Sequence, residues 1–222
     1  DPRLAELVVK SLGVLNANGK VTTPIVKEKA KSTVSEASTD VPDGDSDVDV
    51  DEEEATLYRS NAMRVNFLGQ DRPELQFACR ELAKGMKTPK RRHMGMLKRV
   101  ARFLRRYRRL IQKFPAQGHV GRLDVWVDSN YAGCVRTRKS TMGGVIILGK
   151  ATIKTYCKGQ AVIALSSGEA EYYGLVSGIS QGLGEKAMLA DWDISVDVQL
   201  WMDATAGIAI GSRRGLGRVK HI

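Results

Sequence analysis

Cysteine is scarce in this sequence, and long apolar runs are missing from it. The three cysteines among 222 residues are widely spaced and odd in number, which excludes a disulfide-stabilised scaffold and indicates reduced thiols in an intracellular protein. No apolar run approaches the roughly 20 residues that cross a bilayer, and no signal peptide is visible. With 42% apolar residues, the composition also excludes collagen and a wholly disordered chain. The chain begins at Asp1 instead of Met, so we expect a piece of a longer protein.

The charged residues are unevenly distributed along the chain. In total, 35 lysines and arginines stand against 25 aspartates and glutamates, a formal net charge of +10. By direct count, the stretch from Asp40 to Glu54 holds nine acids and no base, whereas Arg80 to Lys113 holds fourteen bases and one acid. A basic region this dense attracts polyanions, and nucleic acid is the commonest polyanion inside cells. A solvated basic helical surface without a ligand is the alternative interpretation.

The first half of the chain divides into two segments of different composition. Residues 1–55 combine polar residues with the acidic run and show no sustained periodicity, which predicts a disordered acidic linker. Residues 56–117 have apolar residues at helical spacing over 75–86 and again over 97–111, and the second stretch carries basic side chains on its other face. This pattern predicts a basic helical segment that ends near Pro115.

From residue 118 onward, the hydrophobic period changes from helical to alternating. Strands are predicted over residues 123–127, 145–148, 151–157 and 196–202, the middle two forming a hairpin. Ser166, followed three residues later by Glu169, predicts the start of a helix through a capping box, and a short helix is predicted over 204–210. Residues 118–222 are therefore predicted to form an α/β domain with a mixed sheet and helices packed against it.

Three acidic residues occupy unusual positions in this predicted domain. Asp128 ends the first strand, Asp203 ends the fourth, and Glu171 lies in the first turns of the helix between them. If the first and fourth strands are parallel neighbours, their ends bring the two aspartates together, and the helix can add the glutamate. Oxygen-only clusters of this kind suit Mg²⁺ or Mn²⁺, and two such ions can activate water for phosphodiester hydrolysis. Solvated acids at strand ends are the alternative, and Glu169 is assigned to the helix cap.

Four sequence motifs resemble those of one known family. They are Val127–Gly133, Arg138–Gly143, Ala164–Tyr172 and Arg218–Ile222. From residue 58 to its end, the chain resembles the Pol polyprotein of copia-type LTR retrotransposons, from the end of reverse transcriptase into ribonuclease H. The third motif is the most specific, because it is near-identical to the family's helix signature and places a glutamate directly after an alanine at Glu171.

The resemblance implies a fold, an activity and a setting. The fold would be a ribonuclease H-like mixed sheet with flanking helices, preceded by the helical connection segment of reverse transcriptase over residues 56–117. The activity would be hydrolysis of the RNA strand in RNA/DNA hybrids, with Mg²⁺ or Mn²⁺ held by Asp128, Glu171 and Asp203. The partners would be the hybrid or other nucleic acid and the reverse-transcriptase palm of the parent polyprotein, with no membrane. The expected location is intracellular, in a cytoplasmic retroelement particle or in the nucleus.

Basic and amide side chains are expected to contact the nucleic acid. The predicted helix over residues 98–113 would grip phosphates without regard to base sequence. Two residues of the second motif would approach the hybrid as well, and so would Gln160, which with Lys158 resembles a Lys/Gln pair that the family has before the long helix. Together, the expected contacts are Arg99, Arg102, Arg105, Arg106, Arg109, Arg138, Lys139 and Gln160.

The sequence also departs from the family pattern. Asn130 stands where the family usually has a second aspartate, and Ala204 replaces the asparagine of an Asp-Asn pair. The family continues beyond the position of Ile222 with a helix, a strand and a fourth carboxylate, so we expect an incomplete domain, truncated before its last strand and helix. A degenerate, catalytically inactive nucleic-acid-binding remnant is therefore the alternative function. An integrase or transposase is disfavoured, because those enzymes order their acids Asp, Asp, Glu, whereas the order here is Asp, Glu, Asp.

Overall fold

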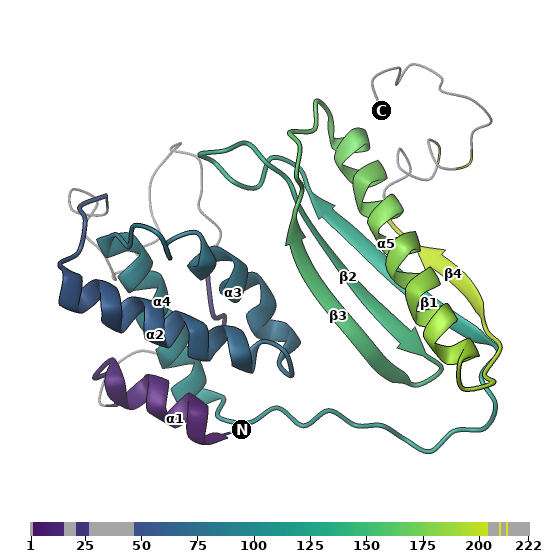
Figure 1. Ribbon diagram of the computed structural model, residues 1–222, viewed down its shortest axis with the longest axis horizontal. Helices are drawn as coiled ribbons and strands as arrows, with labels where there is room; N and C mark the ends of the chain where they lie inside the picture. The colour runs from purple at the N-terminus through teal and green to yellow at the C-terminus, as the bar shows by residue number, and fades with distance from the viewer. Residues whose placement is uncertain (1, 16–20, 27–46, 204–208, 210–211, 213–222) are drawn as a thin grey trace. The chain divides into compact units, whose positions relative to one another are not determined.

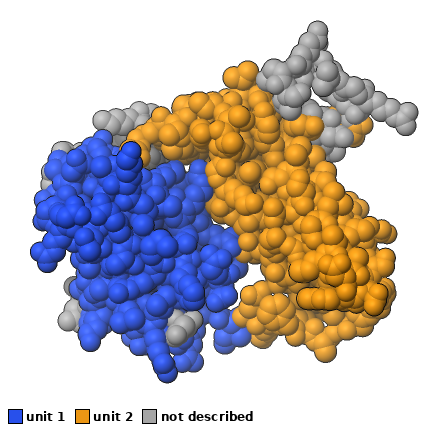
Figure 2. Space-filling view, viewed as in Figure 1, with its two compact units in different colours: residues 1–111 blue, residues 112–222 orange. Residues whose placement is uncertain are grey.

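The computed structural model describes residues 2–15, 21–26, 47–203, 209 and 212 (Figure 1). The chain divides into two compact units, unit 1 with residues 1–111 and unit 2 with residues 112–222 (Figure 2). The break falls inside a stretch from 107 to 121 that forms neither helix nor strand, a few residues before the boundary expected from the sequence. Among the described residues, none of the helices is both long and apolar enough to span a membrane.

Unit 1 is built from helices around a single apolar core. Its elements are α1 (Pro2–Ser11), α2 (Glu52–Leu68), the 3₁₀ turn η1 (Pro73–Leu75), α3 (Gln76–Ala83) and α4 (Arg91–Arg106). Apolar residues from all of these elements are buried together, among them Val8, Tyr58, Leu75, Leu82 and Leu97. Pro73 occupies the first turn of η1, where its missing N–H costs nothing.

Helix α1 and the start of α2 lie where the sequence predicts a linker. Helix α1 buries Ala5, Val8 and Val9 in the core of unit 1, so its apolar residues do find a helical face. Helix α2 begins directly after Asp51, whose carboxylate accepts a hydrogen bond from the Glu54 N–H at 2.8 Å. The acids of this first turn complement the positive end of the helix dipole. The linker prediction is therefore wrong for residues 2–11 and 52–55, because the average composition of residues 1–55 hides two short segments that are helical. Residues 27–46 lie outside the described residues.

Helix α4 ends earlier than the apolar pattern predicts. The pattern continues to Ile111, but the helix stops at Arg106, and Tyr107 is its C-cap. The buried guanidinium of Arg72 donates to the Tyr107 carbonyl at 2.8 Å and to the Arg108 carbonyl at 3.5 Å. A cation that binds carbonyls left unpaired at a helix C-terminus stabilises that end. This contact joins residues 35 positions apart along the chain, so periodicity could not reveal it.

Unit 2 is a mixed sheet with one long helix across it (Figure 1). Its elements are β1 (Arg122–Asn130), β2 (Thr141–Leu148), β3 (Ala151–Gly159), α5 (Ser167–Ala190) and β4 (Asp197–Trp201). The strand order is β3-β2-β1-β4, with β2 antiparallel to both neighbours and β1 parallel to β4. The predicted α/β class, the β2–β3 hairpin and the parallel pairing of the first and fourth strands are confirmed. The helix predicted over 204–210 lies almost entirely outside the described residues.

Helix α5 packs unusually close to the sheet, because glycines face the strands. A Cβ atom at Gly182 would lie 2.8 Å from Val125 and 2.9 Å from Val198. One at Gly178 would collide with Val127. These valines are on the buried side of the alternating β1 and β4, so α5 covers that face of the sheet. The N-terminus of α5 is capped as predicted, since the Ser166 hydroxyl accepts a hydrogen bond from the Glu169 N–H at 3.1 Å.

Candidate functional site

Asp128 and Asp203 sit at equivalent positions of two adjacent parallel strands. The last residues that pair between β1 and β4 are Trp126 and Trp201, and each aspartate follows two residues later. The two tryptophan rings stack at 5.3 Å, and the Trp201 indole N–H donates to Asp124 at 2.7 Å, which fixes the register of the strands. Both aspartates are exposed. On the other neighbour, β2, the residue paired with Asp128 is Gly143, so no side chain stands opposite this carboxylate.

Glu171 completes the group from the second turn of α5. The side chain is half-buried, and its surroundings raise the pKa of its carboxyl group from 4.5 to about 7. Burial is the largest cause, followed by the negative charges of Asp128 and Asp203. The charges of Asp128 and Asp203 therefore reach Glu171 in the folded protein, although the three residues lie far apart along the chain.

The three acids do not form a closed cage around an ion. Among the described residues, no group of three or more acids, histidines or cysteines is arranged to hold a metal ion. Mg²⁺ does not require such a cage, because it usually keeps several waters and binds one or two carboxylates together with substrate phosphates. An oxygen-only donor set whose members repel one another is the environment that a divalent cation relieves. The donor chemistry at this site thus fits Mg²⁺ or Mn²⁺.

Glu169 stands beside Glu171 in sequence but serves the helix. It is only 3% exposed, and its carboxylate accepts a hydrogen bond from the Leu165 N–H at 2.7 Å. The sequence interpretation placed this contact on Ser166, one residue later, so the structural role is confirmed and the partner is corrected. Glu169 also accepts a hydrogen bond from the Tyr173 hydroxyl, and burial together with this carboxylate raises the pKa of Tyr173.

The arginines that the sequence predicts to bind phosphates, in α4 and just after it, fall into two groups. Arg99 donates to the Thr23 hydroxyl at 3.2 Å and Arg105 donates to the Leu15 carbonyl at 2.7 Å, so both are held by the N-terminal part of unit 1. Arg102 is half-buried and also has a partner within the protein. Arg106 and Arg109 are exposed. Of the arginines predicted to bind phosphates from this region, the last two are the ones that face solvent.

Arg138, Lys139 and Gln160 all lie at the end of the sheet that carries Asp128. Both basic residues lie in the loop between Asn130, the last residue of β1, and Thr141, the first residue of β2. Arg138 is exposed and Lys139 is half-buried. This loop turns back through a hydrogen bond from the Arg138 N–H to a carbonyl four residues earlier, and Arg138 adopts a left-handed conformation with φ of 56°. Gln160, in contrast, is only 3% exposed, and its side chain donates inside the protein, so this structure does not offer it to a ligand.

Two residues that shape the site were not singled out from the sequence. The hydroxyl of Ser140, a fully buried residue, accepts a hydrogen bond from the Ala132 N–H at 3.0 Å and holds the loop after β1. The Tyr131 hydroxyl donates to the Leu165 carbonyl at 3.3 Å, which ties the same loop to the entrance of α5. Both belong to the matching motifs, but a motif does not show which of its members contact each other.

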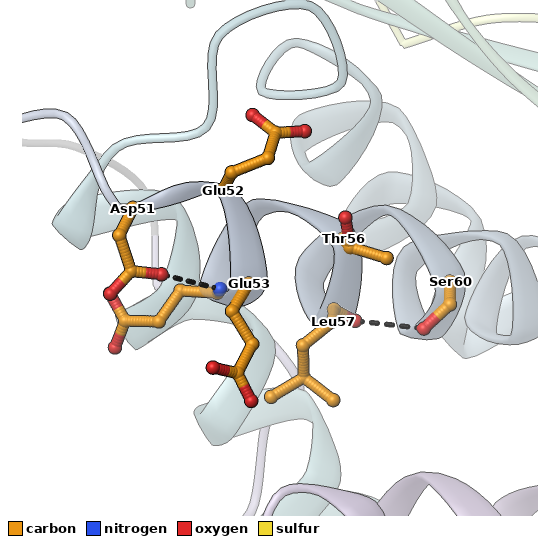
Figure 3. A pocket seen from close by; sticks show the side chains of 7 residues that line it. Asp51, Glu52, Glu53, Thr56, Leu57 and Ser60 are labelled. Atoms are coloured by element: carbon orange, nitrogen blue, oxygen red, sulfur yellow. Dashed lines mark hydrogen bonds between the residues drawn. The ribbon is translucent and has the colours of Figure 1, made fainter.

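An open depression lies beside the first turns of α2 (Figure 3). Its lining is acidic and includes Asp51, Glu52 and Glu53. Asp51 is occupied by the helix cap, and Ser60 donates to the Leu57 carbonyl within the same helix (Figure 3). The depression is explained by the start of the helix, and its negative lining disfavours the polyanion that the rest of the chain attracts.

Comparisons with known proteins agree with the motifs. The chain is 31% identical over 117 residues to the retrovirus-related Pol polyprotein from transposon RE1 of Arabidopsis thaliana, a match that covers 53% of this chain and 8% of that protein. It is 30% identical over 124 residues to the uncharacterized mitochondrial protein AtMg00810 of Arabidopsis thaliana, covering 53% of this chain and 49% of that protein. It is 34% identical over 104 residues to the secreted RxLR effector protein 161 of Plasmopara viticola, covering 47% of this chain and 72% of that protein.

The chain matches only part of the length of these Arabidopsis relatives. The chain spans less than a tenth of the length of the RE1 polyprotein and about half of AtMg00810. No protein-family model and no solved structure matches the chain. The similarity to the transposon polyproteins and the motifs around Asp128 and Glu171 point to the same group of proteins. The comparisons therefore confirm the resemblance of the chain to the retrovirus-related Pol polyproteins of transposons.

Proposed function

We propose that unit 2 is a ribonuclease H-type domain that hydrolyses the RNA strand of RNA/DNA hybrids with divalent metal ions. The observation that carries the proposal is the raised pKa of Glu171, about 7, which burial causes first and the negative charges of Asp128 and Asp203 add to. Their order along the chain and the order of the strands fit this family of nucleases. The expected setting is an intracellular retroelement particle or the nucleus, with the reverse-transcriptase palm of the parent polyprotein as a partner.

The protein's own groups would divide the work between metal binding and phosphate binding. Asp128, Glu171 and Asp203 would hold Mg²⁺ or Mn²⁺, which supplies the Lewis acidity that phosphodiester hydrolysis needs. The glycine opposite Asp128 leaves room above that carboxylate. Arg138 and Lys139, in the adjoining loop, would hold the phosphates of the hybrid. The exposed Arg106 and Arg109 of unit 1 would add contacts that are independent of base sequence.

Substitution of Asp128 tests the proposal directly. The full chain should cleave the RNA strand of an RNA/DNA hybrid when Mg²⁺ is present, and EDTA should stop the cleavage. The Asp128→Asn protein should fold but lose cleavage, because the amide cannot supply the negative charge that the ions need. Asp197→Asn is the matched control, since Asp197 begins β4 at the opposite end of the strand from Asp203. Cleavage by Asp128→Asn at the wild-type rate, or cleavage that EDTA leaves unchanged, would contradict the proposal.

A nucleic-acid-binding protein without catalysis is the second candidate. It is favoured by the lack of a closed three-ligand metal group among the described residues. Asn130 also favours it, because the family resemblance implies an aspartate at this position. This protein would bind hybrids in a salt-sensitive way and leave them intact at every Mg²⁺ concentration. A gel-shift assay and a cleavage assay on the same labelled hybrid separate the two candidates.

A further inference from the structure

Gln160 connects the two elements that carry Asp128 and Glu171. It follows β3 directly, and its backbone N–H donates to the Ser140 carbonyl at 2.9 Å. Its side-chain amide donates to the Ala170 carbonyl at 2.7 Å and to the Ser129 hydroxyl at 3.3 Å. Ser129 is the neighbour of Asp128 in β1, and Ala170 is the neighbour of Glu171 in α5. A single side chain thus bridges the residues adjacent to two of the three carboxylates.

The chemistry of the contacts fixes the orientation of the Gln160 amide. The Ala170 carbonyl can only accept a hydrogen bond, so the group that faces it must be the NH₂ of the glutamine. The carbonyl oxygen of the same amide is then buried, and it has no hydrogen-bond partner among the described residues. Burying such an acceptor without a partner is unfavourable, which argues against a residue that only fills space at this position.

Gln160 lies where the first turns of α5 meet the end of β1. Helix α5 approaches the end of β1 through Gly174, where an added Cβ atom would lie 3.7 Å from Ser129. Gln160 is anchored from behind, because Ser140 precedes β2 and is fully buried. A longer or shorter bridge would therefore change the distance between the two carboxylates.

We propose that Gln160 is a positioning residue that sets the separation of Asp128 and Glu171 for metal binding. The inference rests on the proposed function, since it assumes that these carboxylates hold divalent ions. It differs from the sequence interpretation, in which Gln160 contacts the hybrid itself.

The test compares Gln160→Met with Gln117→Met in the full chain. Methionine keeps the length of glutamine and removes the hydrogen bonds. Gln117 also makes two hydrogen bonds to the backbone, to Leu148 and Lys150, but at the opposite end of the β2–β3 hairpin. Mn²⁺ affinity is measured from the free-ion signal in electron paramagnetic resonance, and thermal unfolding is measured in parallel. We expect Gln160→Met to weaken Mn²⁺ binding about tenfold, as substitutions of residues behind metal ligands do, and Gln117→Met to leave it unchanged.

A second measurement needs no metal. Amide hydrogen exchange of the ion-free proteins reports whether the strand end and the helix start separate. Faster exchange confined to residues 129–132 and 168–171 in Gln160→Met supports the inference, and unchanged exchange there overturns it. If Gln160→Met does not fold, two milder variants replace it. Gln160→Asn keeps the amide on a shorter side chain, and Ser129→Ala removes only the contact between Gln160 and Ser129.

The outcomes separate this inference from the proposed function. Wild-type Mn²⁺ affinity in a folded Gln160→Met protein overturns the positioning role and leaves the proposed nuclease intact. A wild-type protein that binds no Mn²⁺ contradicts the proposed function, and the ion-free exchange comparison then decides whether Gln160 spaces the two elements.

Discussion

The pKa of the Glu171 carboxyl group depends on its surroundings in the folded protein. An exposed glutamate titrates near 4.5, whereas burial and the charges of Asp128 and Asp203 raise the pKa of Glu171 to about 7. The folded protein therefore holds this proton more tightly than the unfolded chain does. Without metal, the contribution of Glu171 to stability is most favourable below pH 4.5 and declines as the pH rises through about 7.

Glu171→Gln should remove this decline. At about pH 5 the variant and the wild type should unfold at similar temperatures, and at about pH 8 the metal-free variant should be the more stable, because the amide carries no charge at either pH. Thermal unfolding in EDTA across this range measures the difference. Glu185→Gln, on the same helix and ion-paired with Lys154, serves as the control for loss of a glutamate charge. A difference that does not grow with pH would contradict the raised pKa of Glu171.

At the scale of elements, the contact between α5 and the sheet decides whether the acids meet. Glycines let the helix backbone lie close to Val125 and Val127. Glu171 lies in the N-terminal turns of the same helix, where the charge of Asp128 acts on it. A side chain in the glycine contact would move the helix outward and increase the separation of Glu171 and Asp128. The packing of α5 on the sheet therefore determines the position of Glu171 relative to Asp128 and Asp203.

Gly178→Ala tests this relation between packing and site. The added methyl group collides with Val127, and overpacking of this kind costs about 1–3 kcal/mol. Gly184→Ala is the matched control, because no atom lies within 4 Å of its added Cβ and alanine favours a helix by about 1 kcal/mol over glycine. We expect chemical denaturation to show a loss of stability for the first and a gain for the second. The reverse order, or equal stabilities, would show that α5 does not pack as described.

At the scale of the whole molecule, the chain consists of two units with separate cores. Residues 107–121 between their ordered elements are almost all exposed and form no helix or strand. A segment of this kind is the preferred site of proteolysis in a folded protein. It holds several basic residues and no acid.

Limited proteolysis should therefore depend on the protease. Trypsin should cut within residues 107–121 before it cuts inside α5 or the strands of unit 2, as mass spectrometry of early products would show. A glutamate-specific protease should leave the segment intact, because it contains no glutamate. Early tryptic cuts inside β1–β3 would contradict the division into two stable units.

The charge of the whole chain gives a further prediction. With a net charge of +10, binding to a hybrid should depend mainly on phosphate contacts and weaken by at least about tenfold between 50 and 200 mM salt. Fluorescence anisotropy with a labelled hybrid measures this slope. Arg106→Gln with Arg109→Gln should reduce the slope, whereas Arg99→Gln should change stability more than binding, because Arg99 is held by Thr23. A salt-independent affinity would exclude the phosphate contacts.

Local pattern was sufficient for much of unit 2. Alternation located β1 and β4, apolar and turn residues located the β2–β3 hairpin, and the Ser166 motif located the start of α5. The parallel pairing of β1 and β4 was a condition of the sequence argument, and the structure confirms it. The same reasoning failed for α1 and for the end of α4. Helix α1 is short, and its stability comes from burial against distant helices, while α4 is ended by Arg72, which lies outside its own sequence.

The sequence by itself determined which residues have the chemistry for metal and phosphate binding and on which elements they lie. Only the tertiary structure decided which way they face: Gln160 and Arg99 have the right groups for nucleic acid, yet their hydrogen bonds go to their own chain. The physical reason is that residue type fixes what a side chain can bind, whereas its direction depends on contacts between segments far apart in the sequence. The coupling of Asp128, Glu171 and Asp203 likewise exists only because the close packing of α5 on two parallel strands brings them together.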